Sequence, residues 1–380
     1  MFGRKVMRYR LLVIGICFCG QMMAQGSIGS LIGKVKSMRD STVVKGIDSS
    51  YIEVPDKPWQ IILRTNVNQT IVSMQTEGTM AGQDYHAKPY LKTTPSKHVG
   101  LWVGYRGLGM GYSMNVGGDK GRKLTFGCTG GAYGVNVHIH SFENGNPDFN
   151  LNSNLLTEDN KEAWNDIHLT EPIRVRTVFA DAYYMFNGKH FSYSAAYKQR
   201  VIQKRSAGSL MAGLMYNYTR IDYASNTNGD LVYLMEGLGK VKLWQGSVGV
   251  GYTYNWVPAR GLLVNVMAMP MLTLVNKLKG YGYATNVPEL MEDPLFWDPN
   301  TTDEEWDEWF YERVRITHMA DKTFNSGVSL GFDARMSVTY NFGRYFFNAY
   351  GQFNNIRYHH NNSTGYLNDW FINTSIGIRL

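Results

Sequence analysis

The sequence predicts an all-β fold, a transmembrane up-and-down antiparallel β-barrel of about 12 strands, within a range of about 10–14. Three observations predict it: apolar and polar side chains alternate along many short segments, the composition is poor in charge and rich in rings, and the strand pattern continues to the last residue. Charged residues make up 18% of the 380 residues, whereas an ordinary soluble domain carries about 25%. Because Tyr contributes 25 residues, Phe 17 and Gly 40, we expect a surface of rings and small residues.

The alternation is clearest in residues 326–341, which read SGVSLGFDARMSVTYN. Every second residue from Val328 to Tyr340 is apolar, and small, polar or charged residues stand between them. A side-chain period of two indicates a strand with one apolar face and one polar face. Residues 100–116 alternate large apolar residues with glycine or small polar ones. That pattern would destabilise a soluble sandwich, but it suits a barrel whose small residues face the lumen and whose large residues face lipid.

Segments of this kind recur from Trp59 onward. They comprise residues 100–106, 107–116, 133–140, 173–186, 191–197, 207–218, 242–256, 261–272, 326–341, 344–353 and 367–380. No stretch after residue 24 holds 18 uninterrupted apolar residues, which argues against membrane-spanning helices. A membrane protein without such helices must be a closed barrel, because only closure satisfies every backbone group in lipid.

Residues 1–24 are typical of a cleavable secretory signal peptide. Four basic residues precede an apolar core that is too short to span a membrane, and a small residue precedes the expected cleavage site. Loss of these four basic residues lowers the formal charge from +7 to +3, so we expect no nucleic-acid partner. Cys17 and Cys19 leave with the signal, so Cys128 is the single cysteine of the mature chain and we expect no internal disulfide.

The order of segments predicts a periplasmic extension, residues 25–58, followed by an outer-membrane barrel, residues 59–380. With the C-terminus in the periplasm, residues 276–325 form a long external loop. The same alternation places residues 141–172 in the periplasm and the short turn at residues 187–189 outside, contrary to the usual loop lengths of bacterial barrels. The assignment of the N-terminal half is consistent only if one strand is missing from it.

The chain end and the rings indicate where the barrel meets its surroundings. Residues 367–380 alternate to the last position, and in outer-membrane barrels such a strand closes on the first and serves as the assembly signal. We therefore expect outer-membrane lipid and the barrel-assembly machinery as partners, in a Gram-negative envelope. Rings at strand ends predict girdles at the two membrane interfaces; these are Tyr252, Tyr254, Trp256, Tyr345, Phe346, Phe347, Trp370 and Phe371.

Three blocks resemble an uncharacterised family of outer-membrane β-barrels from Bacteroidetes, a domain of unknown function. They are DSSYIEVPDKPW at residues 48–59, PSKHVGLWVGYRGLGMGYS at residues 95–113, and FNGKHFSYSAAYKQRVIQKRSAGSLMAG at residues 186–213. The third block is the most distinctive, and the resemblance covers most of residues 48–380. It implies a location and a fold but no chemistry.

Two histidines stand on one predicted strand face. His138 and His140 alternate with Val137 and Ile139 and share their face with Asn136. The spacing directs both imidazoles into the lumen, where they could bind a metal or shuttle protons, or simply line the lumen as polar residues. Spacing identifies no third ligand, so we expect no metal site.

Charged residues also alternate toward the lumen. Asp333 and Arg335 share the polar face of residues 326–341. Charges inside a small barrel pair across strands or set ion selectivity. We expect Arg174 and Arg176 to be their partners.

The most unusual segment is residues 288–315, PELMEDPLFWDPNTTDEEWDEWFYERVR. Thr302 and Glu305 form a capping box that predicts a short helix. The ring-bearing residues Trp297, Trp306, Trp309 and Phe310 form either a platform for a ligand or glycan, or a lid buried against other loops. Departures from the calcium-loop pattern exclude an EF-hand.

The function expected from the sequence is an outer-membrane barrel with a structural role or a narrow pore that passes a small solute or a glycan. No cofactor and no enzymatic activity are expected, because spacing gathers no Ser, His and Asn or Asp into a triad. Two alternatives stay open: a barrel enzyme acting on outer-leaflet lipid, and a soluble periplasmic β-rich binding protein.

Overall fold

The computed structural model describes residues 46–380 except 81–82, 118–119, 146–147, 155–170, 236, 299 and 361–362. The signal peptide expected at residues 1–24 lies outside these residues, as does most of the extension expected at residues 25–58. Residues 47–380 form one structural unit, and the fold is that of this unit.

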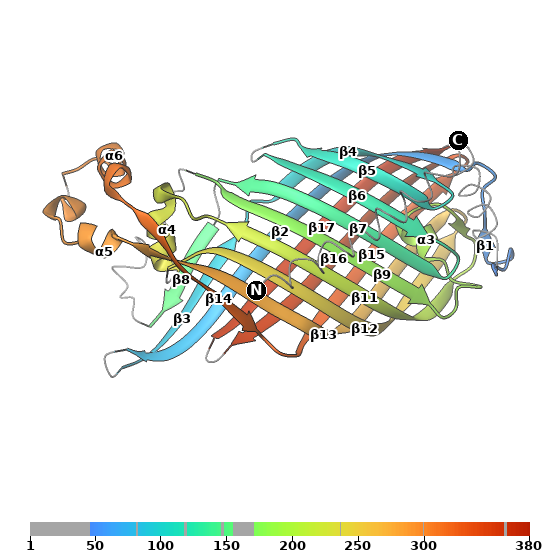
Figure 1. Ribbon diagram of the computed structural model, residues 1–380. Helices are drawn as coiled ribbons and strands as arrows, with labels where there is room; N and C mark the ends of the chain where they lie inside the picture. The colour runs from blue at the N-terminus through green and yellow to red at the C-terminus, as the bar shows by residue number, and fades with distance from the viewer. Residues whose placement is uncertain are drawn as a thin grey trace, which may run out of the picture. The chain divides into compact units, whose positions relative to one another are not determined.

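Twelve antiparallel strands close into a barrel (Figure 1). They belong to a sheet of 15 strands, of which β3, β8 and β14 stand outside the ring. The last strand closes on the first, with Ile376 opposite Leu63, and the predicted 12-stranded barrel is confirmed. The ring comprises β2 (Trp59–Met80), β4 (Ser96–Tyr105), β5 (Leu108–Asn115), β6 (Gly121–Thr129), β7 (Tyr133–Asn144), β9 (Ile173–Met185), β11 (Ala207–Asp222), β12 (Leu238–Ala259), β13 (Leu262–Thr285), β15 (Ser329–Phe342), β16 (Tyr345–His360) and β17 (Ser363–Arg379).

The expected strands differ from the observed ring at three places. Residues 191–197, expected as a strand, contain the helix α3 (Tyr193–Tyr197), and the short turn expected at residues 187–189 leads into it. The strand β6 was missed, and no expected segment covers β2. Without a strand at residues 191–197, the connection between β7 and β9 lies at the same end as the other long loops, as barrel topology requires. The conflict in the N-terminal half therefore came from an extra strand, not from the missing strand that was expected.

Side chains alternate through the barrel wall as the sequence predicts. On β15, Met336 is 58% exposed on the outside, whereas Asp333 and Arg335 are buried inside. Among the described strands no second sheet packs on the exterior, so the outward apolar faces have no protein partner. A closed barrel with an apolar exterior is the architecture that spans a bilayer without helices.

Exposed rings gather at the rim that carries the C-terminus, on or next to β2, β9, β12, β15 and β16. Those more than two-fifths exposed are Trp59, Tyr184, Phe186, Tyr252, Tyr254, Trp256, Tyr340, Phe342, Tyr345 and Phe347. Such a belt is typical of a membrane interface. Phe346, expected in the belt, faces the lumen and is fully buried, because it has the opposite parity from its neighbours; Phe371 also faces inward.

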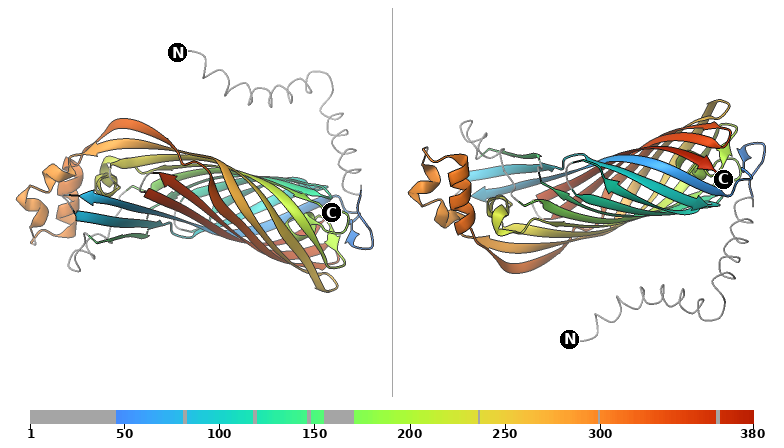
Figure 2. Two further views of the ribbon diagram at one scale, coloured as in Figure 1. Left: turned by 90° about the horizontal axis from the view of Figure 1, so that it is seen from below. Right: turned by 90° about the horizontal axis from the view of Figure 1, so that it is seen from above.

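The opposite end of the barrel carries the long connections (Figure 2). The expected loop at residues 276–325 is shorter than predicted, because β13 continues to Thr285 and β14 (Ile316–Asn325) pairs with that extension. The remaining elements at this end are β3 (Gln83–Lys92), β8 (Asp148–Ser153), η2 (Asn226–Asn228), α4 (Gly229–Leu234), α5 (Val287–Leu290), η3 (Pro294–Trp297) and α6 (Asp303–Arg313). None of the helices in the described ranges is long and apolar enough to cross a bilayer.

At the C-terminal rim a small two-stranded sheet joins distant segments. It pairs β1 (Ile52–Glu53) with β10 (Ile202–Gln203). Ile52 is only 1% exposed, and Asp48 N donates to Lys189 O at 3.0 Å. The part of the extension that the structure describes is therefore docked on the connection between β9 and β11.

Candidate functional site

The connection between β9 and β11 folds back into the barrel. We call residues 187–206 the plug. Its helix α3 begins at a cap in which Ala195 N donates to Ser192 Oγ at 3.2 Å, and all five helical residues are buried. Figure 1 shows α3 inside the end of the barrel that carries the C-terminus.

Wall side chains hold the plug from several strands. The plug carbonyls of Ser192, Ala196 and Gln199 accept hydrogen bonds from inward-facing residues. The bonds are Asn255 Nδ2 to Ser192 O at 3.1 Å, Asn348 Nδ2 to Ala196 O at 3.1 Å, Gln60 Nε2 to Gln199 O at 2.9 Å and Arg379 Nη2 to Gln199 O at 2.8 Å. Because buried backbone carbonyls require partners, the inward amides of the wall and the plug form one packed interior.

A buried charge network lies beside the plug. Arg335 Nη2 donates to Asp181 Oδ2 at 3.1 Å, and its Nε donates to Asp333 Oδ1 at 3.3 Å. Arg335 Nη1 donates to the phenol oxygen of Tyr193, in α3, at 3.2 Å. Tyr183 also contacts Arg335 and donates to Asp333 Oδ2 at 3.0 Å. The network pairs its charges and ties the plug to the wall.

The partners expected for Asp333 and Arg335 were wrong. Arg174 and Arg176 point out of the barrel, and Arg174 lies 3.9 Å from Glu143 at the end opposite the plug. The acid that completes the network is Asp181. Parity could have identified it, because Arg174 and Arg176 alternate in phase with the outward Ala and Tyr residues of β9, whereas Asp181 has the opposite phase.

The two histidines of β7 lie on the lumen side. His140 Nε2 is 3.2 Å from Nε2 of His98, a β4 residue that spacing within β7 had no means of revealing. His138 lies between Phe179 and Phe371, with ring centroids 6.1 and 6.4 Å away. No three His, Cys, Asp or Glu side chains among the described residues group as a metal site.

Three cationic side chains form what we call the basic cluster. Arg64 Cζ lies 4.2 Å from the centroid of the Trp102 ring, and Lys198 Nζ lies 4.9 Å from the same centroid. Lys123 Nζ lies 4.8 Å from the Phe371 ring. No carboxylate in the described ranges lies within 4.0 Å of any of the three. Rings contact these cations, and the carboxylates nearest in effect, Asp369 for Lys123 and Asp181 for Lys198, lie beyond ion-pair distance.

The interior is occluded but not completely filled. Arg64, Lys198, His138 and Tyr350 face the lumen yet keep accessible surface. Two enclosed cavities farther toward the loop end measure only about 20 Å³ each, room for about one water molecule. The space that these two cavities leave is therefore too small for a solute larger than water.

A second closure lies toward the loop end. The helix α4 places Leu231 and Val232 against inward apolar side chains of β7, β9 and β11. The buried members of this cluster are Phe142, Ile173, Val175, Ile221, Tyr223, Leu231 and Val232. Solute passage requires movement at both closures.

The α4 closure contains an acid that makes it sensitive to pH. Burial raises the pKa of Asp230 from 3.8 to about 6, and one carboxylate oxygen has no hydrogen-bond partner among the described residues. Since the folded state binds the proton more tightly, α4 docking is expected to weaken as pH rises, by about 2 kcal/mol between about pH 4 and about pH 7.

Hydrogen exchange of the α4 amides, corrected for intrinsic rates, measures this weakening. Asp230→Asn is expected to slow exchange at neutral pH and to abolish the pH dependence. A pH dependence that persists in Asp230→Asn would assign the effect to another group.

The ring-bearing loop residues pack mainly on one another. The capping box at Thr302 and Glu305 is present and begins α6, as predicted. Phe310 is 1% exposed, and Trp306 stacks on it with centroids 4.7 Å apart. Trp309 is half-buried in the same cluster. Trp297 is 64% exposed, so it alone of the four presents most of its ring to solvent.

A G-x-S-x-G pattern, the signature of a nucleophilic serine, occurs at residues 327–331. Its serine, Ser329, begins β15 and accepts a hydrogen bond from Asn276 Nδ2 at 3.2 Å. The motif requires a sharp turn from a strand into a helix, and residues 327–331 lead into a strand. Ser329 therefore lacks the structural context of a nucleophilic serine, although the sequence pattern matches.

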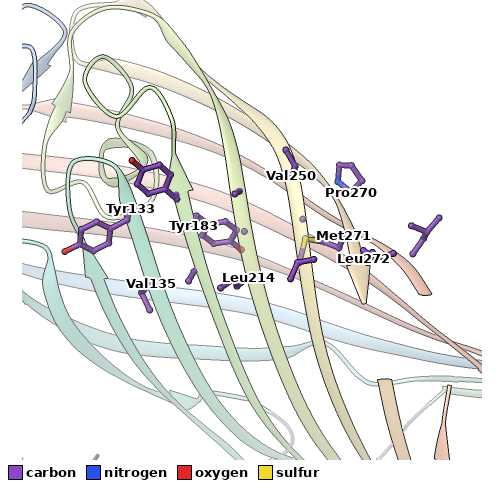
Figure 3. Close-up of a pocket in the computed structure, with 15 residues that line it drawn as sticks. Tyr133, Val135, Tyr183, Leu214, Val250, Pro270, Met271 and Leu272 are labelled. Carbon is purple, nitrogen blue, oxygen red and sulfur yellow. The ribbon is translucent and has the colours of Figure 1, made fainter. Parts of the chain in front are cut away.

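The outer wall carries a hollow of about 860 Å³, which we call the wall groove (Figure 3). It crosses six strands, from β7 to β15, between two rows of outward residues. One row follows the register Val135, Ala182, Leu214, Val248, Leu272 and Leu330. The other row runs through Tyr133, Tyr184, Ala212, Val250 and Pro270. Its lining is almost entirely apolar.

The sequence matches one known protein family over most of its length. The family model "Domain of unknown function (DUF4421)" matches residues 46–379. The chain belongs to the DUF4421 family. Among curated proteins no match to this DUF4421 chain was found.

Solved structures similar to this DUF4421 protein are bacterial outer-membrane proteins and domains of low sequence identity. OprG, an outer membrane protein from Pseudomonas aeruginosa, is 12% identical over 85% of this chain and 98% of its own, with a TM-score of 0.27. The β domain of the Bordetella autotransporter BrkA is 11% identical over 86% and 100%, with a TM-score of 0.31. An outer membrane channel from Pseudomonas putida F1 is 10% identical over 87% and 98%, with a TM-score of 0.28.

Proposed function

We propose that this protein is an outer-membrane barrel that passes a small anionic solute through a lumen that the plug closes at rest. Its location in the outer membrane of a Gram-negative, Bacteroidetes envelope is part of the proposal. The signal-like residues 1–24, the apolar exterior and the aromatic belt support that location. Outer-membrane lipid and the barrel-assembly machinery are the partners it requires.

The basic cluster is the observation that carries the anionic preference. Buried charges are normally paired, because an isolated ion inside a protein loses its hydration without compensation. Arg64, Lys123 and Lys198 face the lumen without a carboxylate at ion-pair distance among the described residues. Arg and Lys side chains arranged around the lumen make a pore selective for anions.

The plug supports gated rather than permanent passage. It occupies the barrel end that carries the C-terminus and is bonded to several strands. A barrel of 12 strands has little free bore once side chains fill it. The resting protein is therefore expected to conduct poorly, and conduction depends on release of the plug.

Replacement of residues 187–206 by a short Gly-Ser turn tests closure by the plug and the preference for anions, both measured in planar bilayers. Conductance is expected to rise by roughly tenfold or more over that of the intact protein, and the reversal potential in a salt gradient is expected to show anion preference. Arg64→Gln with Lys123→Gln in the same background is expected to abolish that preference. Arg122→Gln, an outward residue next to Lys123, is the matched control that retains it.

Two outcomes would contradict the proposal. A folded plug-replacement barrel that still fails to conduct would show either that the plug is not the gate or that the α4 closure alone blocks the lumen. Adding Leu231→Ser and Val232→Ser to the plug replacement distinguishes the two explanations, because it weakens the α4 closure. Conduction that is cation-selective with Arg64 and Lys123 intact would reject the anionic solute.

A further inference from the structure

The floor of the wall groove is rich in glycine. Between the two outward rows lies a row of lumen-facing residues that includes Gly134, Gly213, Gly249 and Gly331. The wall is only backbone thick at these positions. The outward neighbours Ala182 and Ala212 are also small, so the hollow deepens at the centre, where β9 and β11 pair.

Lumen side chains press against the glycines from the other side. A Cβ on Gly213 would lie 2.6 Å from Met269 Cε, and one on Gly249 would lie 2.4 Å from Met271 Sδ. A side chain at Gly213 would therefore displace the end of a flexible methionine, and one at Gly249 would also meet the backbone oxygen of Pro270 at 2.6 Å. The floor of the groove is thin, apolar and supported by Met side chains, which adapt their shape readily.

We propose that the wall groove binds one acyl chain of a membrane phospholipid. The groove lies on the outward face of the barrel, where exposed side chains such as Leu214 and Val250 have no protein partner. In a membrane-spanning barrel this face meets hydrocarbon, so the matching occupant is an alkyl chain.

The dimensions of the groove match one leaflet. Six strands spaced about 4.8 Å apart give a length of about 24 Å across the strands. With strands tilted by about 40°, this length covers about 15 Å along the membrane normal. The hydrocarbon core is about 30 Å thick, so the groove spans the depth of a single leaflet.

The two ends of the groove differ in polarity, as an amphiphile requires. One end lies at Tyr133 and Tyr184, close to the aromatic belt of the C-terminal rim. The other end lies at Leu330, which is 72% exposed. Tyr rings suit the headgroup level because one edge is apolar and the hydroxyl is polar. The phospholipid headgroup is thus placed at the rim and its chain along the groove toward Leu330.

A phosphatidylethanolamine with a photoreactive diazirine in one acyl chain tests the site in nanodiscs containing the full-length mature protein. Cross-links mapped by peptide mass spectrometry are expected to concentrate on β9, β11 and β12. Ala182→Phe with Ala212→Phe fills the centre of the groove and is expected to reduce those cross-links roughly fivefold. Val266→Phe, on the outward face of β13 outside the groove, is the matched control and retains them.

Heat-modifiable migration on a gel verifies that each variant folds. If the variant with Ala182→Phe and Ala212→Phe does not fold, the single variant Ala212→Phe takes its place. Cross-links spread evenly around the barrel, or unchanged in the filled variants, would overturn the proposal. Cross-links absent because two protein copies cover the groove would also overturn it, and the molecular mass of the nanodisc-embedded protein reports that outcome. The inference rests on the membrane location in the proposed function. Its test does not involve conduction, so failure of the lipid site is distinguishable from failure of the proposed passage of anions.

Discussion

Replacing Arg335 by alanine is expected to destabilise the barrel by about 3–5 kcal/mol. The substitution leaves Asp181 and Asp333 buried next to each other without their shared cation. It also removes the hydrogen bond to Tyr193 that ties the plug to the wall. Urea titration in liposomes, followed by the folded fraction on a gel, measures the loss of unfolding free energy.

A rescue variant separates the charge imbalance from the loss of packing. Arg335→Met combined with Asp181→Asn and Asp333→Asn removes all three charges at similar volume, and it is expected to recover most of the stability. Met336→Ala, at the neighbouring outward position, is the control for a substitution on β15 and should cost far less. An Arg335→Ala barrel as stable as the intact one would show that the network does not hold the interior together.

Met336→Arg is expected to destabilise the membrane-inserted barrel by about 2–4 kcal/mol. Met336 is 58% exposed and lies six residues from Phe342, the last residue of β15. At about 3.4 Å per residue and a tilt of about 40°, this position lies about 15 Å from the rim, near the bilayer midplane. An arginine there loses its hydration to hydrocarbon.

The same substitution distinguishes a membrane barrel from a soluble one. On a water-exposed surface, Met336→Arg should change stability by less than about 0.5 kcal/mol. Leu295→Arg, in the loop region and 49% exposed, serves as the matched control with little expected effect. Equal and small effects at both positions in urea titrations would contradict a lipid-facing wall.

Much of the barrel follows from local alternation. A period of two in side-chain polarity assigns each residue of a strand to one face, which is why Asp333, Arg335, His138 and His140 are found on the lumen side. The same rule failed for residues 191–197, because a short run of Tyr, Ser and Ala suits a buried helix as well as a strand. The strand β6 escaped notice because its polar positions Arg122 and Lys123 interrupt the pattern.

The contacts between residues on different strands could not be predicted from the local sequence pattern. The acid for Arg335 is Asp181, which is 154 residues distant along the chain, and His98 meets His140 from another strand. Such contacts depend on register and on which strands lie opposite each other across the lumen, and no short-range period encodes either. Arg174 and Arg176 were assigned by charge alone, without the parity of β9, and the assignment was wrong.

The sequence by itself determined that the chain forms a barrel with one apolar and one polar face, since alternation and turn residues are local properties. Only the tertiary structure decided that the lumen is plugged, that three cations gather there without a carboxylate at ion-pair distance among the described residues, and that lumen-facing glycines on neighbouring strands align beneath the wall groove. Closure of the ring brings these residues together, because it sets the register of all twelve strands at once.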